Sequence, residues 1–350
     1  MMKSKKSVLS VLGKIEGLPV FCVLLLMFII FLITAPEVFT HPLIYLSFLQ
    51  TVPPILVLGL GLTLVVTAGE IDLSFPAIVA LSGFVFSWFI KNFPEAAWAA
   101  WVGLLLALCA GALVGVVNGL IVAKIGVPSI IATLAAQFFW YGITILLAGG
   151  LQLNIKEVEQ TPIHTIFTGR IFGNIPAQAV WALGLSILLW FILNRHKFGE
   201  AIMFIGDNPN VARVMGINVD AVKIKLFTLM GIIAAFSGLL LTIEINVFFP
   251  TQGQGFLLSV MAAVFIGGTL ISGGYGSIVG SFIGAYLIGS LQAGVVATGI
   301  TSYWVQTIMG LILAVAVSLN VAMNEGKLTN FFRKVNRLFG GEKENPPVKN

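Results

Sequence analysis

The sequence predicts an all-α protein, a polytopic bundle of about ten transmembrane helices with both termini in the cytoplasm. Hydrophobic residues make up 58% of the 350 residues and charged residues only 9%, whereas soluble domains have about 45–50% and about 25%. Residues 245–324 contain no charged side chain, and the mean hydropathy is +1.03. A soluble chain of this size needs charges along its whole length to keep its surface hydrated. The composition therefore excludes a soluble globular protein.

Long apolar runs give the individual spans. A bilayer core of about 30 Å requires roughly 20 apolar residues per helix. Two neighbouring spans meet at residues 70–76 with barely one turn between them. The ten predicted spans are, in order, residues 17–35, 45–69, 74–90, 97–122, 129–147, 176–194, 222–243, 256–272, 276–296 and 302–321.

The positions of the basic residues predict the orientation, because cytoplasmic loops carry an excess of Lys and Arg. Ten spans with both ends inside leave only Lys91, Lys156 and Arg170 on the outer side. The inner side then receives Lys3, Lys5, Lys6, Lys14, Lys124, Arg195, Lys197, Arg213, Lys223, Lys225, Lys327, Arg333, Lys334, Arg337, Lys343 and Lys349. This one-sided distribution indicates anionic lipid as the partner of the positive charge, and not nucleic acid.

Two predicted helices carry glycines at every fourth position. Glycines with this spacing share one helix face and allow helix backbones to approach closely inside a membrane. Either packing within one chain or a homodimer seam accounts for the pattern. The six helix-packing candidates are Gly111, Gly115, Gly119, Gly276, Gly280 and Gly284.

The sequence lacks three motifs that are typical of enzymes. It has no Gly-x-x-x-x-Gly-Lys-Ser/Thr phosphate loop, no His-Glu-x-x-His and no Gly-x-Ser-x-Gly. Its three histidines fall in predicted loops, and Cys22 and Cys109 fall in apolar runs, which excludes a disulfide framework and a Cys-based metal site. We therefore expect no catalytic residues, no bound metal and no enzyme activity.

Polar residues within the spans suggest what the bundle carries. A carboxylate in the middle of a span usually marks a proton or ion pathway, but Glu70 and Asp72 lie at a span junction and Glu244 at an outer helix end. A proton- or sodium-coupled mechanism is therefore disfavoured. Uncharged groups suit a hydrated path for a neutral polar solute, although each could instead form a helix–helix hydrogen bond. The solute-path candidates are Gln50, Asn118, Gln137 and Gln292.

The longest inner loop, residues 195–219, contains a short predicted helix. Asn208-Pro209 is a helix start, with Asn as N-cap and Pro at the first helical position, and Gly216 is a natural stop. Between them, an apolar face is formed by Val211, Val214 and Met215, while Arg213 projects elsewhere. This face must lie on the lipid surface or in a groove of a cytosolic partner.

The same loop contains the runs Phe198-Gly199-Glu200, Gly206-Asp207-Asn208, Val211-Ala212-Arg213 and Gly216-Ile217. In these runs it resembles the coupling loop of ATP-binding-cassette (ABC) importer permeases of the ribose, xylose and autoinducer-2 group, which are related to branched-chain amino acid permeases. Residues 67–74, Asn118-Gly119-Leu120 with the region to Leu134, and residues 262–276 also resemble this group. Glu200 and Asp207 replace the Arg and Gly that are usual there, which puts the charge match to the ATPase in doubt.

This resemblance implies that the chain is the permease subunit of an importer that moves a small neutral polar solute, in that group a sugar, inward. The implied partners are cytosolic ABC ATPase subunits, an extracytoplasmic solute-binding protein, and a second permease, identical or homologous. The chain would bind no cofactor, because ATP and Mg²⁺ belong to the ATPase. The implied coupling residues are Gly199, Gly206, Asn208, Val211, Ala212, Arg213, Val214, Met215, Gly216 and Ile217.

We expect a permease domain at residues 1–325, a basic cytoplasmic tail at residues 326–350, and a location in the bacterial cytoplasmic (inner) membrane. Two alternatives remain open at this point. One is a secondary transporter of a neutral solute, and the other is a membrane scaffold protein that transports nothing.

Overall fold

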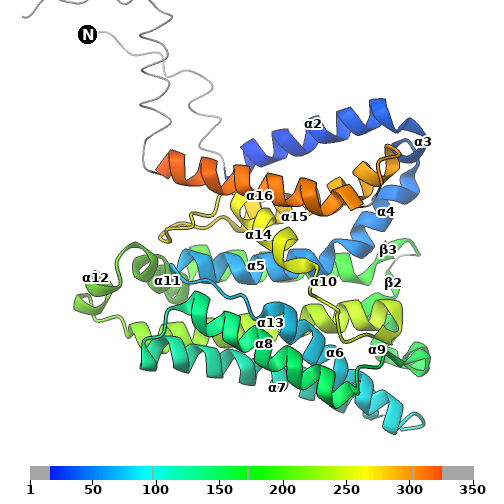
Figure 1. Cartoon of the computed structure of the whole chain (residues 1–350), viewed down its shortest axis with the longest axis horizontal. Coiled ribbons are helices and arrows are strands. Elements are labelled where there is room, and N and C mark those ends of the chain that lie inside the picture. Colours follow the sequence, from blue (N-terminus) through cyan, green and yellow to red (C-terminus); the bar gives the residue numbers. More distant parts are fainter. Residues whose placement is uncertain (1–15, 97, 172, 302, 325–350) are drawn as a thin grey trace, which may run out of the picture.

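The computed structural model describes residues 16–96, 98–171, 173–301 and 303–324 and consists mainly of helices lying side by side (Figure 1). The longer helices are α2 Leu18–Thr34, α4 Pro42–Thr51, α5 Pro53–Thr67, α6 Phe75–Asn92, α7 Ala99–Leu120, α8 Ser129–Ala148, α10 Ala177–Arg195, α11 Lys197–Asp207, α13 Val219–Ile245, α14 Phe256–Ile266, α15 Ile278–Ala297 and α16 Tyr303–Asn324. The short ones are α3 Pro36–Phe39, the π-helical turn η1 Ile121–Ile125, the 3-10 helix η2 Lys156–Gln160, α9 Pro162–Thr168 and α12 Pro209–Val214.

Two pairs of very short strands join the loops at the end opposite to α12. Strand β1 (Leu153–Asn154) pairs antiparallel with β4 (Val247–Phe248), and β2 (Arg170–Ile171) pairs antiparallel with β3 (Ile175–Pro176). These strands only link loops, so the molecule is an all-α membrane bundle.

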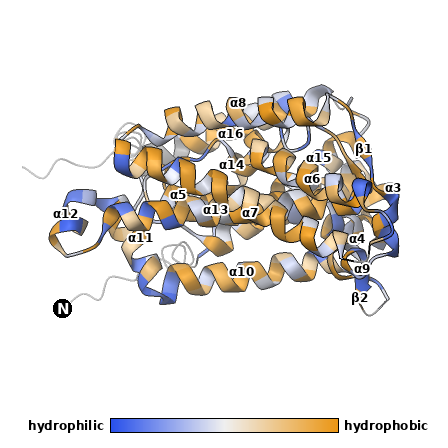
Figure 2. Cartoon of the chain, turned by 90° about the horizontal axis from the view of Figure 1, so that it is seen from below, coloured by the Kyte–Doolittle hydropathy of each residue, from blue (hydrophilic) through white to orange (hydrophobic). Residues whose placement is uncertain are grey.

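The apolar character is concentrated in the middle of the bundle. Figure 2 shows hydrophobic residues along the helices and hydrophilic segments at the two ends. Among the described residues, α6, α7 with η1, α8, α10, α13 and α15 are long and apolar enough to cross a membrane, and the bent pair α4–α5 brings the number up to seven. Three shorter apolar helices, α2, α14 and α16, coincide with the remaining predicted spans. Ten spans in a bilayer remain a prediction.

Two predicted spans differ in shape from the expectation. The span at 45–69 is broken into α4 and α5 with a bend of 48°, because Pro53 has no N–H to continue the helix and its ring clashes with the preceding turn. The span at 256–272 is helical only to Ile266. Gly268 follows with φ 90°, a left-handed conformation that ends the helix. The chain then forms an irregular loop before α15.

Helix α5 forms the centre of the bundle. Each of its residues is buried, and it packs against α10, α13, α14 and α15. A helix that is apolar on all sides is expected to be surrounded by protein. Helix α8, in contrast, presents many large apolar side chains outward, among them Phe138, Phe139 and Leu146.

The described basic residues separate between the two ends. The end that carries α11 and α12, here called the coupling end, also holds Lys124, Arg195, Lys197, Arg213, Lys223 and Lys225. The elements of the opposite end carry Lys91, Lys156 and Arg170. Lys3, Lys5, Lys6, Lys14 and the tail at 326–350 lie outside the described residues.

Candidate functional site

Helix α12 projects from the coupling end beyond the neighbouring helices (Figures 1 and 2). Its first turn is capped by Asn208, whose Oδ1 accepts hydrogen bonds from the backbone N–H groups of Asn210 (2.9 Å) and Val211 (3.2 Å). Gly216 ends it with φ 84°, which favours glycine because a Cβ would clash with the backbone. The segment between cap and stop is thus a short helix with both ends defined by local interactions.

The two faces of α12 have different surroundings. Ala212 is fully buried and packs with Ile205 and Val219. Val214 is 90% exposed, Met215 57% and Val211 52%. Hydrophobic side chains so exposed on a projection beyond the apolar band are typical of a surface that another molecule covers.

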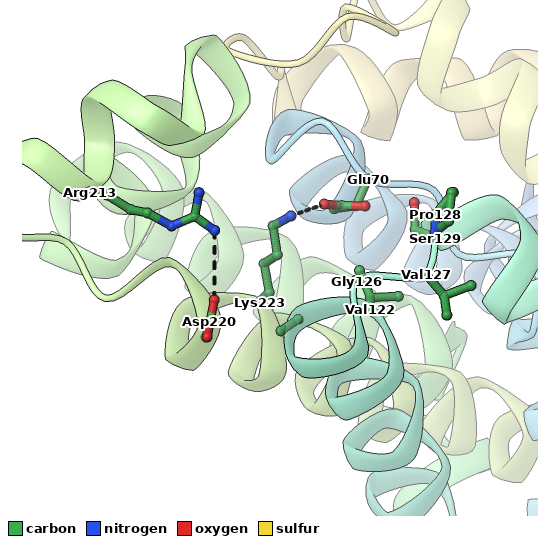
Figure 3. A pocket seen from close by; sticks show the side chains of 10 residues that line it. Glu70, Val122, Gly126, Val127, Pro128, Ser129, Arg213, Asp220 and Lys223 are labelled. Atoms are coloured by element: carbon green, nitrogen blue, oxygen red, sulfur yellow. Dashed lines mark ion pairs between the residues drawn. The ribbon is translucent and has the colours of Figure 1, made fainter.

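Arg213 faces a carboxylate of its own chain. Its Nη2 lies 3.8 Å from Asp220 Oδ1, and Lys124 Nζ lies 3.0 Å from Asp220 Oδ2 (Figure 3 shows the Arg213 pair). The carboxylate therefore links α12 to the end of α7. Each of these side chains is at least 31% exposed, so water screens the attraction and the pairs can exchange when α12 is displaced.

Helix α11, which sequence reasoning did not find within the 195–219 loop, connects α12 to the membrane bundle. A Cβ on Gly206 would lie 1.9 Å from the carbonyl oxygen of Thr67 and 2.4 Å from the backbone nitrogen of Gly274. That nitrogen itself donates a hydrogen bond to Thr67 O at 2.9 Å. The end of α11, the end of α5 and the loop between α14 and α15 therefore touch through backbone atoms. A side chain at position 206 would separate them. The surroundings of Gly199 also leave no room for a side chain, since a Cβ at this position would lie 2.2 Å from Leu193 O.

Residues 70–74, between α5 and α6, have no regular secondary structure inside the protein. Three side chains of α8, one turn apart, bind the backbone of this segment and of the first turn of α6. Ser129 Oγ accepts from Ile71 N (3.1 Å), Thr133 Oγ1 from Leu73 N (3.0 Å), and Gln137 Oε1 from Ala77 N (2.8 Å). Backbone polar groups that are buried outside regular secondary structure need such partners. We call Ser129, Thr133 and Gln137 the α8 clamp.

Other helices hold the same segment from other sides. Asp72 is fully buried, and its Oδ1 accepts hydrogen bonds from the backbone N–H and the hydroxyl of Ser74, at 2.7 and 2.6 Å. Asn118 of α7 donates to Ser74 Oγ at 2.8 Å. Glu70 forms an ion pair with Lys223 of α13. The segment is therefore fixed by exchangeable side-chain contacts to three helices.

A cavity of about 240 Å³ lies beside these ion pairs at the coupling end. Figure 3 shows that Glu70, Lys223, Arg213 and Asp220 line it together with the turn that leads into α8. It lies between α12 and the irregular segment.

The two series of glycines at four-residue spacing, here called the glycine stripes, lie at helix contacts within the chain. Cβ atoms at Gly111, Gly115 and Gly119 would meet α13 backbone atoms, the closest being Gly231 O, Phe227 O and Ile224 Cα at 2.3, 2.2 and 2.7 Å. Cβ atoms at Gly276, Gly280 and Gly284 would meet Thr67 Oγ1, Gly267 O and Ala263 O at 1.9, 1.8 and 2.2 Å. Both glycine stripes therefore pack against other segments of the same chain.

The four solute-path candidates do not converge. Gln137 binds the backbone of the first turn of α6 and Asn118 binds Ser74 of the irregular segment, as described, and Gln292 donates to Ser259 Oγ at 3.0 Å between α15 and α14. Gln50 lies at the opposite end, where its amide binds Glu244.

Sequence reasoning missed Ser129, Thr133 and Gln178, although the four-residue spacing of Ser129, Thr133 and Gln137 was a readable signal. Within the described residues, no three His, Cys, Asp or Glu side chains are grouped as a metal site would need.

Comparison with known proteins finds relatives over most of the chain. Residues 44–317 match the family model described as "Branched-chain amino acid transport system / permease component". The chain is 33% identical to the ribose import permease protein of Escherichia coli over 263 residues, which is 75% of this chain and 80% of that protein. It is 32% identical to the ribose import permease protein of Bacillus subtilis over 313 residues (88% and 94%), and 31% identical to the fructose import permease protein of Rhizobium meliloti over 282 residues (78% and 76%). No solved structure matches the chain.

Proposed function

The chain belongs to the family of branched-chain amino acid transport system permease components and is the membrane subunit of an ABC importer, and we propose that it moves a small neutral sugar into the cell. The sugar assignment is supported by the relatives named as ribose and fructose import permeases. A transport subunit of this kind has no ATPase site of its own.

The exposed face of Val211, Val214 and Met215 is the observation that carries the mechanism. We propose that this face docks in a groove of the ATPase subunit. ATP and Mg²⁺ are bound by that subunit and not by this chain. Burial of Ala212 and the Asn208 cap make α12 rigid enough to transmit a displacement. At the other end of α11, Gly206 lies against the backbone of Thr67 and Gly274. Movement of the ATPase groove would therefore shift the irregular segments that follow α5 and α14.

The segment at 70–74 is suited to receive this displacement. Its bonds to Ser129, Thr133 and Lys223 come from side chains of other helices, and side-chain bonds can be exchanged without unwinding a helix. We propose that the α8 clamp holds the segment in the present state and that the ATPase cycle releases it.

The family and the distribution of basic residues support a proposal for the topology and assembly. We propose ten spans with the coupling end in the cytoplasm, a permease domain at residues 1–325 with its coupling loop at 195–219, and a basic cytoplasmic tail at 326–350. The family implies an ATPase subunit and an extracytoplasmic solute-binding protein as partners. We further propose a pair of permeases, identical or homologous, in the bacterial inner membrane.

Uptake of radiolabelled sugars into proteoliposomes tests the function. The vesicles contain this chain with its candidate ATPase, the binding protein is supplied on the outer side, and ribose, fructose and other pentoses and hexoses are compared. The proposal predicts uptake that requires ATP and the binding protein and persists with an ionophore. Uptake that survives ATP depletion and collapses with the ionophore would indicate a secondary transporter. If no solute is taken up although the complex assembles, the proposed transport of a sugar is wrong.

A further inference from the structure

Three polar side chains from three helices meet at the end opposite to α12. Gln50 lies in the last turn of α4, Gln178 in the first turn of α10, and Glu244 in the last turn of α13. The amide nitrogen of Gln50 donates to Oε1 of Glu244, and that of Gln178 donates to Oε2. We call these residues the Glu244 cluster.

The position of the Glu244 carboxylate is electrostatically unfavourable. None of the ion pairs among the described residues involves it. It also lies near the C-terminus of α13, where the helix dipole disfavours negative charge. A neutral amide would join α4, α10 and α13 without this cost, so cohesion between the helices does not explain a charged group here.

The cluster has unused hydrogen-bonding capacity. Gln178 is completely buried, and its Oε1 has no hydrogen-bond partner. A buried acceptor without a partner costs free energy. Each glutamine amide also has a second N–H, and a carboxylate can accept about four hydrogen bonds. The cluster therefore offers donors and acceptors side by side, and Glu244 and Gln50 are only partly buried.

We propose that the Glu244 cluster is a recognition site for the hydroxyl groups of a sugar as it enters the permease, an inference that rests on the proposed sugar transport. Each sugar hydroxyl donates one hydrogen bond and accepts others, so neighbouring hydroxyls can donate to Glu244 and to Gln178 Oε1 while accepting from the amides. A cation would instead meet the two N–H groups that already point at the carboxylate. The 48° bend between α4 and α5 lies just after Gln50, and movement about this bend would open the cluster to an entering sugar.

The experiment uses the reconstituted complex of permease, ATPase and binding protein loaded with D-ribose, or with whichever sugar the parent complex transports. Glu244→Gln keeps the shape and removes the charge. Its matched control is Glu159→Gln, which changes a carboxylate at the same end that binds Asn246 at 2.8 Å. We expect the number of sugar molecules transported per ATP to fall about tenfold in Glu244→Gln, the scale of one hydrogen bond to a charged group. Assembly and the stimulation of ATP hydrolysis by the binding protein should be retained, and Glu159→Gln should match the parent.

A second variant guards against a folding defect. Gln50→Cys, made in a chain carrying Cys22→Ser and Cys109→Ser, gives a thiol whose reaction with a water-soluble reagent is followed during turnover. With ATP present, the sugar-loaded binding protein should slow this labelling more than the sugar-free binding protein does. Unchanged transport per ATP in Glu244→Gln overturns the proposal, as does labelling that sugar does not affect. Loss of binding-protein stimulation would instead assign the cluster to protein docking and also overturn it. A parent complex that transports no sugar refutes the proposed function, which is a separate result.

Discussion

Gly206 at the end of α11 lies directly against the carbonyl oxygen of Thr67 at the end of α5, so closely that a Cβ at position 206 would stand 1.9 Å from this oxygen. The contact joins the coupling loop to the centre of the membrane bundle through backbone atoms alone. A displacement of one element should reach the other almost undiminished through such a backbone contact, because no flexible side chain lies between them.

Gly206→Ala tests whether this contact couples the two elements. The added methyl group meets the backbone of Thr67 and Gly274, which cannot move cheaply, so we expect a loss of about 1–3 kcal/mol in stability and weaker coupling of ATP hydrolysis to uptake. Gly142→Ala on α8 is the matched control, because a Cβ there meets nothing within 4 Å. Thermal unfolding in detergent and uptake per ATP are measured. A Gly206→Ala variant that behaves like the control would contradict the account.

Thr133→Val tests the α8 clamp. Valine has nearly the same shape but cannot accept the hydrogen bond from Leu73 N–H, which leaves a buried donor unpaired at a cost of about 1–3 kcal/mol. Faster hydrogen exchange of the amides at residues 71–77 is therefore expected. Thr144→Val on the same helix removes a hydroxyl that bonds only to Trp140 O of its own helix, and it should leave this exchange unchanged. Equal exchange rates in the two variants would refute the clamp.

Gly280→Leu tests close packing between α15 and the end of α14. The side chain would begin 1.8 Å from Gly267 O, so the two segments must separate, and we expect a clearly lower unfolding temperature in detergent. Gly184→Leu is the control, because position 184 on α10 is exposed and open. If both variants are as stable as the parent, the stripe does not contribute to packing.

Cysteine accessibility tests the orientation. Cysteines introduced at Glu157 and at Asp207, in a chain without Cys22 and Cys109, should react differently with a membrane-impermeant reagent on whole cells. Labelling at 157 is expected without permeabilisation, and labelling at 207 only after it. The reversed pattern would mean that the coupling end faces outward, contrary to the ten-span topology.

Much of the helical framework can be predicted from the sequence, because apolar length and the turn residues between spans are local properties. The α12 helix, with Asn208-Pro209 at its start and Gly216 at its end, is predicted for the same reason. The break at Pro53 was also readable, since Pro cannot continue a helix interior, but the apolar run through it suggested a single span.

The arrangement of polar side chains could not be predicted, because it depends on contacts between helices far apart in sequence. Gln137 and Asn118 suit a solute path by their chemistry, yet the fold places Gln137 against Ala77 in the first turn of α6 and Asn118 against Ser74. Gln178 carries no signal in the sequence, because a lone glutamine at the start of a span belongs to no local pattern. Its meaning appears only when α4 and α13 bring Gln50 and Glu244 beside it.

The central claim is that the exposed face of α12 couples this permease to its ATPase, and Val214→Asp tests it most directly. Val214 is 90% exposed in the free subunit, so the charge should not disturb folding, but it would be buried without a partner in an apolar groove. Asn210→Asp is the control, because it adds the same charge to another exposed position of α12. ATPase stimulation and sugar uptake are measured in the reconstituted complex. The account predicts that Val214→Asp folds, inserts and loses coupled uptake, while Asn210→Asp keeps it. A Val214→Asp variant that binds the ATPase and transports as well as the parent would contradict it.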